Sequence, residues 1–311
     1  MTDHANLSTW IWRQAWLPLA IRKLAYKQLS KQKEAPDYPF TCDFYGLQYQ
    51  GNLRNGIEFA IYFYGAFEKP LLHFLRDAMR ALRPESGVFC DIGANIGQHS
   101  LFMSQCCAHV HAFEPLAAVS DRLKQQIALN NLSNITIHEL GLSDSNGKLP
   151  FYAPTGSNQG VGSFDADSQT RGNQPIGELE IARGDDYMAA LAINQIDIMK
   201  IDVEGFEQKA IDGLRETLRR TRPVIALEVT YGDAHSFPSQ QALLDALPVN
   251  YALYIFDTRK ANGKTARRRG AKAKRTGHYE LQPLQQWRSQ DQDDLVAIPH
   301  ELLAQIPLSN K

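Results

Sequence analysis

FCDIGANIGQHSL, residues 89–101, is the stretch of sequence that decides the fold. Phe89 and Ile92 predict a short buried strand. Residues 93–97 predict a tight turn of small residues, and Gln98 begins a predicted helix. A strand that enters a helix in this way presents backbone N–H groups at its carboxyl end, which is where open α/β sheets bind ligands. The sequence therefore predicts a ligand site at this turn.

The charge of this stretch indicates which ligand fits. A pyrophosphate site prefers the pattern GxGxxG, but Asn95 stands where its second glycine is expected. Asp91, two residues before Gly93, would repel a phosphate. S-adenosylmethionine carries a sulfonium and an ammonium and no phosphate, so we expect it to be the cofactor. The structural alternative is an ordinary strand–turn–helix corner.

A second acid lies at the end of the next predicted strand. Residues 110–113 predict a second strand that ends at Glu114 and Pro115, about 20 residues past the glycine turn, where an acid commonly holds a ribose diol. A carboxylate can accept both hydroxyl protons, and a proline cannot continue the hydrogen-bonding ladder. The sequence therefore predicts that Glu114 contacts the cofactor.

The composition limits the remaining choices. A chain of 311 residues suits one enlarged domain, and 43% hydrophobic with 22% charged residues is typical of a globular protein. The net charge of −1 predicts no polyanionic partner, which disfavours nucleic acid. The four cysteines form no CxxC pair, which predicts reduced thiols and no zinc. No apolar run reaches ~20 residues and no signal peptide is evident, so we expect a cytoplasmic protein.

Residues 1–40 predict a basic helical extension with a break at Pro18. Residues 8–33 hold three of the four tryptophans and several cations, with no acid among them: Trp10, Trp12, Trp16, Arg13, Arg22, Lys23, Lys27, Lys31 and Lys33. Such a stretch suits the surface of an anionic membrane. The alternative is a helix that packs on its own domain or on a second subunit, as in a homodimer.

Residues 41–86 are expected to lead into the core. Alternating aromatic residues in 41–66, with turns at Asn52 and Asn55, predict a β-hairpin or small sheet. A helical period follows in 71–82. The segment that joins these parts ends at Glu68, which we expect to lean over the glycine turn as a lid.

Residues 87–311 alternate strands and helices, which predicts an α/β fold with a doubly wound, Rossmann-like sheet. A third strand over 135–140 is expected to end in a turn at 141–144 that flanks the cofactor's adenine. Residues 151–164 predict a hairpin or mobile loop, in which Asn158, Gly160 and Ser163 face the substrate or serve as turn residues. Further strands are expected at 196–201, 224–229, 251–256 and 295–298. The basic insert 264–275 predicts a mobile solvated loop, which grips an acidic substrate or a membrane surface or has no such role.

Acids recur at the ends of the predicted parallel strands. Asp91, Glu114, Asp202 and Glu228 all fall at or near such ends and should converge on one crevice. Burying unpaired carboxylates is costly, and a cleft that binds a cation-bearing ligand offsets that cost. The alternative is that each acid is a structural cap or one half of an ion pair.

Four motifs together resemble a known family. DIGANIG at 91–97, FEP at 113–115, GLSD at 141–144 and KIDVEGFE at 200–207 resemble the FkbM family of S-adenosylmethionine-dependent methyltransferases, over roughly residues 60–230. The resemblance implies a class I methyltransferase fold and O-methylation of a hydroxyl on a sugar, glycan or natural product. The expected cofactor-binding residues are Glu68, Asp91, Gly93, Ala94, Asn95, Gly97, Glu114, Pro115, Gly141 and Leu142.

The catalytic residues are expected at the end of the strand over 196–201. Asp202 is the first candidate for the base or the substrate anchor, and Glu204 is the second. Lys200 shares a strand face with Asp202 and is expected to lower its pKa or to pair with it. Glu228 and His235 are candidates from the next strand end. A metal on Asp202 and Glu204 lacks an evident third ligand, so none is expected.

Two other functions fit parts of the sequence. A nucleic-acid methyltransferase would use the basic insert, but an amino-methylating one needs an Asn/Asp-Pro-Pro-aromatic turn where this chain has DVEG at 202–205. A ribose methylase would need a lysine in place of Glu228. A non-catalytic cofactor-binding scaffold is the other alternative, and the intact acids argue against it.

Overall fold

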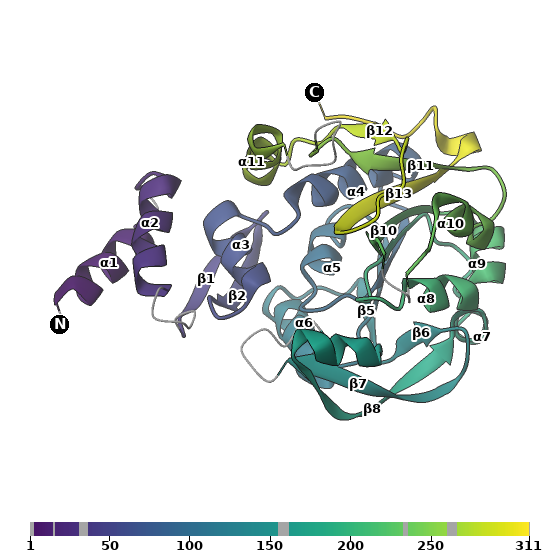
Figure 1. Cartoon of the computed structure of the whole chain (residues 1–311), viewed down its shortest axis with the longest axis horizontal. Helices are drawn as coiled ribbons and strands as arrows, with labels where there is room; N and C mark the ends of the chain where they lie inside the picture. Colours follow the sequence, from purple (N-terminus) through teal and green to yellow (C-terminus); the bar gives the residue numbers. More distant parts are fainter. Residues whose placement is uncertain are drawn as a thin grey trace. The chain divides into compact units, whose positions relative to one another are not determined.

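The computed structural model describes residues 3–14, 16–30, 37–154, 162–232, 236–259 and 266–310. The chain forms two compact units, Met1–Phe67 and Glu68–Lys311. Figure 1 shows the elements of both units in sequence colours. The helix that begins at Lys69 belongs to the second unit, and the boundaries at residues 40 and 86 stay a prediction.

The first unit contains two helices, a β-hairpin and a third helix: α1 (Asp3–Arg13), α2 (Leu19–Ser30), β1 (Pro39–Phe44), β2 (Leu47–Asn52) and α3 (Gly56–Tyr64). The helices α1 and α2 confirm the expected helical segment with a break that contains Pro18. Their shared core is aromatic, because the ring of buried Trp12 lies edge-on to Tyr26 at 5.7 Å and to Tyr38 at 4.8 Å. Aromatic edge-to-face packing therefore stabilises this unit.

The expected hairpin over 41–66 is wrong in its second half. The strands β1 and β2 pair antiparallel, but residues 56–64 form the helix α3. Asn55 decides this outcome, since its side chain accepts hydrogen bonds from the backbone N–H groups of Ile57 and Glu58. These are the groups that a helix leaves unsatisfied at its start, so Asn55 is an N-cap and not a hairpin turn residue.

The second unit is built on an eight-stranded sheet with the order β12-β11-β13-β10-β9-β3-β4-β5. Its strands are β3 (Val88–Ile92), β4 (His109–Phe113), β5 (Ile135–His138), β9 (Ile198–Ile201), β10 (Val224–Thr230), β11 (Tyr251–Phe256), β12 (Leu281–Pro283) and β13 (Gln292–Pro299). The strands from β10 to β5 run parallel, and β13 is antiparallel to both of its neighbours. The order reverses between β3 and β9, which confirms the doubly wound sheet and marks the point where such sheets bind ligands.

Helices cover both faces of this sheet. They are α4 (Lys69–Leu82), α5 (Gln98–Met103), α6 (Ala117–Leu129), α7 (Gly184–Ala190), α8 (Glu207–Gly213), α9 (Arg215–Thr221), α10 (Gln240–Ala246) and α11 (Arg267–Thr276), with 3₁₀ turns at Ala166–Arg171 and His300–Leu302. Figure 1 shows α8, α9 and α10 together on one side of the central strands and α4 and α5 on the other. None of the described helices is both long and apolar enough to cross a membrane.

The expectation of a turn at 141–144 is also wrong. The third strand of the main sheet ends at His138, and residues 141–143 form β6 (Gly141–Ser143) of a separate sheet with β8 (Asn173–Arg183) and β7 (Gly147–Pro154). Leu142 is buried in the main apolar core, and Gly141 lies against the ring of Phe164. Asn158 and Gly160 fall outside the described residues.

The expectation of a solvated loop over the basic insert is wrong as well, because the described part of the insert forms the helix α11. Gly277 ends α11 in the left-handed conformation (φ 73°) and lies so close to the ring of His73 on α4 that a side chain would collide with it. Lys69 Nζ at the start of α4 donates to the carbonyl of Arg275 at 3.2 Å. Arg269 pairs with Asp257, so packing and pairing hold this cationic segment in place.

Candidate active site

The alternation of side chains along the central strands separates an apolar face from a charged one. Ile92 of β3 and Ile201 of β9 join an apolar cluster with residues of α8, α9 and α10. Asp91 and Lys200 point to the opposite face and are direct neighbours in the β3–β9 register. In the same way Glu228 of β10 is the register partner of Asp294 of β13. One face of the sheet therefore carries a row of charged groups toward the carboxyl ends of its parallel strands. We call Asp91, Lys200, Glu228 and Asp294 the charged row.

Lys200 is the cation of this row. Only 4% of it is exposed, and its Nζ lies 3.0 Å from Asp202 Oδ2 and 3.9 Å from Asp91 Oδ1. Burial alone would lower the pKa of Lys200, but the charges of Asp202, Asp91 and Glu68 outweigh burial and raise it. Lys200 therefore stays charged and links the end of β3 to the end of β9.

Asp91 is fully buried beside the glycine turn. Its Oδ2 accepts a hydrogen bond from Ser100 Oγ on α5 at 2.6 Å, whereas its Oδ1 has no hydrogen-bond partner among the described residues. Burial raises the pKa of Asp91, and the positive charge of Lys200 acts against that rise. Asp91 therefore lies beside the glycine turn with one oxygen still able to accept a hydrogen bond.

The glycine turn directs its own donors inward. The N–H groups of Gly93 and Ala94 donate to the carbonyl of Phe113 at 3.0 and 2.9 Å, and the N–H of Gly97 donates to the carbonyl of Ala94 at 2.9 Å. Gly93 adopts φ 79°, and a side chain there would lie 1.8 Å from the carbonyl oxygen of Asp202. Since these N–H groups are already used, the turn is not a phosphate cradle.

Glu114 fixes this turn to the end of β4. Its Oε2 accepts from the N–H of Asn95 and its Oε1 from the N–H of Leu116, both at 3.0 Å. Asn95 needs this support, because it stands in the left-handed region at φ 53°. Burial raises the pKa of Glu114 to about 7. Each oxygen keeps a second lone pair, so Glu114 can still accept from a ligand, and partly buried Pro115 follows it.

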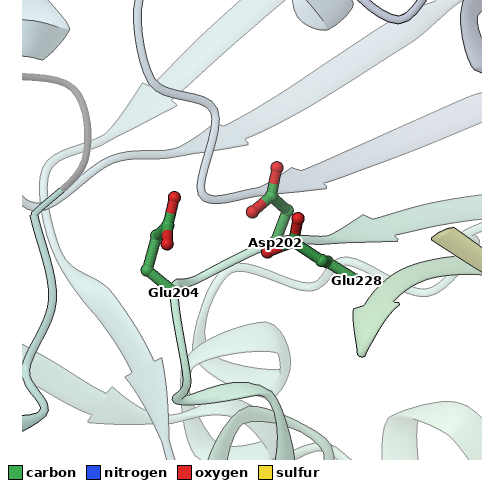
Figure 2. Close-up of side chains that lie close together, drawn as sticks. All are labelled: Asp202, Glu204 and Glu228. Atoms are coloured by element: carbon green, nitrogen blue, oxygen red, sulfur yellow. The ribbon is translucent and has the colours of Figure 1, made fainter. Parts of the chain in front are cut away.

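Three carboxylates lie together near the carboxyl ends of β9 and β10: Asp202 and Glu204 follow β9, and Glu228 lies within β10. Figure 2 shows Asp202, Glu204 and Glu228, and each offers an oxygen within 4.8 Å of the others. The structure thus supplies Glu228 as the third oxygen ligand that a divalent cation on Asp202 and Glu204 would need. Lys200 already neutralises Asp202 at 3.0 Å. Burial, followed by the charges of Asp202 and Glu204, raises the pKa of Glu228 to about 10, so Glu228 is protonated at neutral pH.

Glu68 joins this group from the start of α4. Burial, followed by the negative charges of Asp294 and Asp202, raises the pKa of Glu68 well above the usual range of a glutamate. Its Oε2 lies 3.7 Å from Nε2 of His99 on α5. Burial, and then the charge of Lys200, lower the pKa of His99 well below its usual value, so His99 is neutral. Glu68 therefore reaches the charged row, and its expected role as a lid over the glycine turn stays a prediction.

The turn that carries Glu204 is held from two sides. Glu204 adopts φ 52°, and its carbonyl accepts from Ser163 Oγ at 2.7 Å. Glu207 Oε1 accepts from the N–H groups of Val203 and Gly205 at 3.0 and 3.2 Å. Burial raises the pKa of Glu207 to about 7. Ser163 thus supports a site residue from beneath the turn.

Sequence reasoning missed three members of the site. They are Asp294 and His99, which lie outside the four motifs, and Glu207, which lies inside one but was not selected. Asp294 can be assigned to the site only from its strand pairing with Glu228. His99 can be assigned to it only from its distance to Glu68 in the folded structure. Glu207 ends the KIDVEGFE motif and carried the one available signal, an acid three residues beyond Glu204. His235 falls outside the described residues.

The free energy of unfolding is expected to fall as pH rises from about 6.5 to 8.5. Burial raises the pKa of Glu114, Glu207 and Asp294 to about 7 and that of Glu228 to about 10. The unfolded chain has already lost these protons above pH ~4.5, so stability is lost as pH rises toward the folded values. Urea unfolding at three pH values measures this slope, and Glu228→Gln should flatten it. A free energy that increases over this range would contradict the assignment.

Comparison with known proteins identifies a family match that coincides with this site. The sequence model of the family described as Methyltransferase FkbM domain matches residues 91–256, which is more than half of the chain. The matched range begins at Asp91 and ends at the end of β11, so it contains the glycine turn and the acids at the ends of β9 and β10.

Curated relatives agree at low identity. The chain is 27% identical to 2-O-methyltransferase NoeI of Sinorhizobium fredii over 192 residues, 56% of this chain and 76% of the relative. It is 30% identical to Hexuronic acid methyltransferase AglP of Haloferax volcanii over 155 residues, 48% of this chain and 60% of the relative. It is 27% identical to Methyltransferase 1 of Beauveria bassiana over 148 residues, 42% and 59% respectively. The chain thus spans about three fifths of the length of two of these relatives.

Proposed function

Because this chain belongs to the FkbM family of methyltransferases, we propose that it transfers a methyl group from S-adenosylmethionine to a hydroxyl of a sugar, glycan or natural-product acceptor. The observation that carries the proposal is the charged row at the switch point of the sheet. It places a buried cation and several carboxylates next to the glycine turn. The cytoplasmic location and the homodimer stay predictions.

The residues around the glycine turn fit this cofactor. The N–H groups of Gly93, Ala94 and Gly97 are used inside the protein, while Asp91 Oδ1 is buried without a hydrogen-bond partner among the described residues. The turn therefore offers carboxylate oxygens and not donors. This chemistry suits a sulfonium and an ammonium and disfavours a pyrophosphate. In this proposal Asp91 and Glu114 hold the cofactor, with the backbone of 93–97 beneath it.

The acceptor side of the site follows from Asp202. When bound, S-adenosylmethionine supplies a methyl group that an oxygen nucleophile can attack in line with the C–S bond. A partly exposed carboxylate, held by Lys200 at 3.0 Å, can receive the hydroxyl proton of an acceptor or fix its position. Glu228, which is protonated at neutral pH, can donate a hydrogen bond to a second acceptor oxygen. Orientation of the hydroxyl supplies the remaining rate enhancement.

The acceptor class is proposed from two relatives. NoeI is named a 2-O-methyltransferase and AglP a hexuronic acid methyltransferase. A cluster of carboxylates is chemically suited to several hydroxyl donors on one ring, because each oxygen accepts more than one hydrogen bond. We therefore expect a polyhydroxylated acceptor.

The activity can be tested directly. Purified protein with radiolabelled S-adenosylmethionine is incubated with a panel of sugars, uronic acids and short glycans, and with tRNA and DNA as contrasting acceptors. Label in a sugar as a base-stable, non-volatile methyl ether supports the proposal, and label in nucleic acid overturns it. Calorimetry should detect S-adenosylhomocysteine and not NAD. Cofactor binding without turnover on the whole panel would favour a non-catalytic scaffold.

Glu114→Ala is expected to weaken S-adenosylhomocysteine binding by ~1–3 kcal/mol, which is the cost of leaving polar partners unsatisfied. Glu114→Gln keeps one oxygen acceptor and should lose less. Calorimetry gives the affinity, and thermal unfolding of each variant separates a loosened glycine turn from a lost cofactor contact. Unchanged affinity in Glu114→Ala would remove this residue from the cofactor site.

A further inference from the structure

The first unit carries most of the exposed large apolar side chains of the described chain. Eight such side chains are exposed among the described residues, and five of them lie between residues 7 and 24: Leu7, Trp10, Trp16, Ile21 and Leu24. Trp16 is 73% and Leu24 is 63% exposed. Single exposed apolar residues are ordinary, but a concentration of them in one short stretch marks an interaction surface.

These side chains are arranged on helix faces. Leu7 and Trp10 lie three residues apart on α1, and Ile21 and Leu24 lie three apart on α2, so each pair shares a face of its helix. Trp16 lies in the connection between the two helices. We call these five residues the outer apolar set. Their helices bury other residues, including Trp12, which is 1% exposed. A different face of these helices therefore packs into the core of the unit.

The charge of the same stretch has one sign. Residues 4–33 contain no Asp or Glu, and cations are interleaved with the apolar residues. Arg13 and Lys27 are exposed. Arg22 is partly buried, donating to the carbonyl of Trp12 at 3.0 Å with its guanidinium 5.4 Å from the ring of Tyr62. Some of these cations therefore brace the fold, while Arg13 and Lys27 also present charge to the outside.

We propose that the outer apolar set and the exposed cations Arg13 and Lys27 form a docking surface for an anionic lipid bilayer. Leucine, isoleucine and tryptophan side chains enter the boundary between headgroups and acyl chains, where tryptophan is favoured. Cations beside them meet the negative headgroups. A polyanion such as RNA would meet the cations but leave the apolar side chains in water. A second copy of this surface would place cations against cations.

The test uses full-length protein and vesicles of phosphatidylcholine with 30% phosphatidylserine, compared with pure phosphatidylcholine. Flotation should show binding to the anionic vesicles at low salt, with strong loss at high salt because exposed charges are screened. The double variant Trp10→Ser/Trp16→Ser should bind at least about tenfold more weakly. Lys27→Glu should lose about fivefold or more for each unit of charge.

Matched controls use exposed apolar residues of the second unit. Val249→Ser and Leu191→Ser remove side chains that are 78% and 48% exposed and should leave vesicle binding unchanged. Circular dichroism shows whether each variant is folded, and a brominated-lipid quencher should reduce tryptophan fluorescence in the wild type and the two controls but much less in the double tryptophan variant. Equal binding by the double tryptophan variant would overturn the proposal. So would the absence of binding at low salt, or a dimer in light scattering that the same variant abolishes.

Discussion

Asp202→Asn should lower kcat for methyl transfer by about 10²–10⁴-fold while the fold and the cofactor affinity stay close to those of the wild type. Asparagine has the shape of aspartate but cannot receive a proton from an attacking hydroxyl. Lys200 keeps a partner in the variant, because its Nζ also lies 3.9 Å from Asp91 Oδ1. The change therefore removes a proton acceptor without leaving a buried lysine isolated.

The measurement is steady-state methyl transfer with the acceptor that the panel identifies, together with calorimetry of S-adenosylhomocysteine. Asp212→Asn is a suitable control, since Asp212 pairs with Arg215 near the end of α8, on the apolar side of the sheet. Glu204→Gln separates the second candidate base. If Asp202→Asn turns over at the wild-type rate, Asp202 serves only as the structural partner of Lys200.

The core of the fold was predictable because its signals are local. Phe89 to Leu101 contains a strand, a turn and a helix start within thirteen residues, and β3 and α5 follow that prediction. The acids at the strand ends were predictable for the same reason, since parallel strands bring their carboxyl ends to one edge. Asp91, Glu114, Asp202 and Glu228 accordingly lie at or near the carboxyl ends of β3, β4, β9 and β10, and their convergence on one crevice stays a prediction.

The wrong secondary-structure predictions concern segments where a helix cap or a tertiary contact overrides the preference of the local sequence. Aromatic alternation favoured a strand over 56–64, but Asn55 caps a helix there. The cationic run around Arg269 reads as a solvated loop, whereas Gly277 ends a helix that packs against His73. Gly141 has the composition of a turn residue, but it pairs with Ile181 of β8. Each of these outcomes depends on a cap or on a long-range neighbour that a sequence window does not contain.

The pairings of the charged row also divide into those that the local sequence predicts and those that require the folded structure. Lys200 and Asp202 are two residues apart, so their pairing could be predicted from a strand's period. The Glu228–Asp294 pair joins strands that are far apart in sequence and requires the register of β10 against β13. The raised pKa of Glu228, caused by burial and nearby carboxylates, is likewise a property of the assembled site.

Lys200→Met is expected to lower the free energy of unfolding by about 3–5 kcal/mol, which is the usual cost of removing one partner from a buried ion pair. Methionine keeps much of the apolar stem of lysine but leaves Asp91, which is fully buried, without a counter-charge. Asp91 then has to take up a proton or remain as an uncompensated charge. The loss should therefore be larger at pH 8.5 than at pH 6, because a protonated Asp91 needs no partner.

Urea unfolding at these two pH values provides the measurement, and a double-mutant cycle identifies the partner. Asp91→Asn/Lys200→Met removes both charges and should recover part of the stability that Lys200→Met loses, since no lone charge remains in the core. Lys148→Met is the matched control, because Lys148 pairs with Glu180 on an exposed hairpin where an ion pair contributes little. A Lys200→Met variant as stable as the control would mean that Asp91 is protonated in the wild type as well. The charged row would then depend on Asp202 alone to hold Lys200 in place.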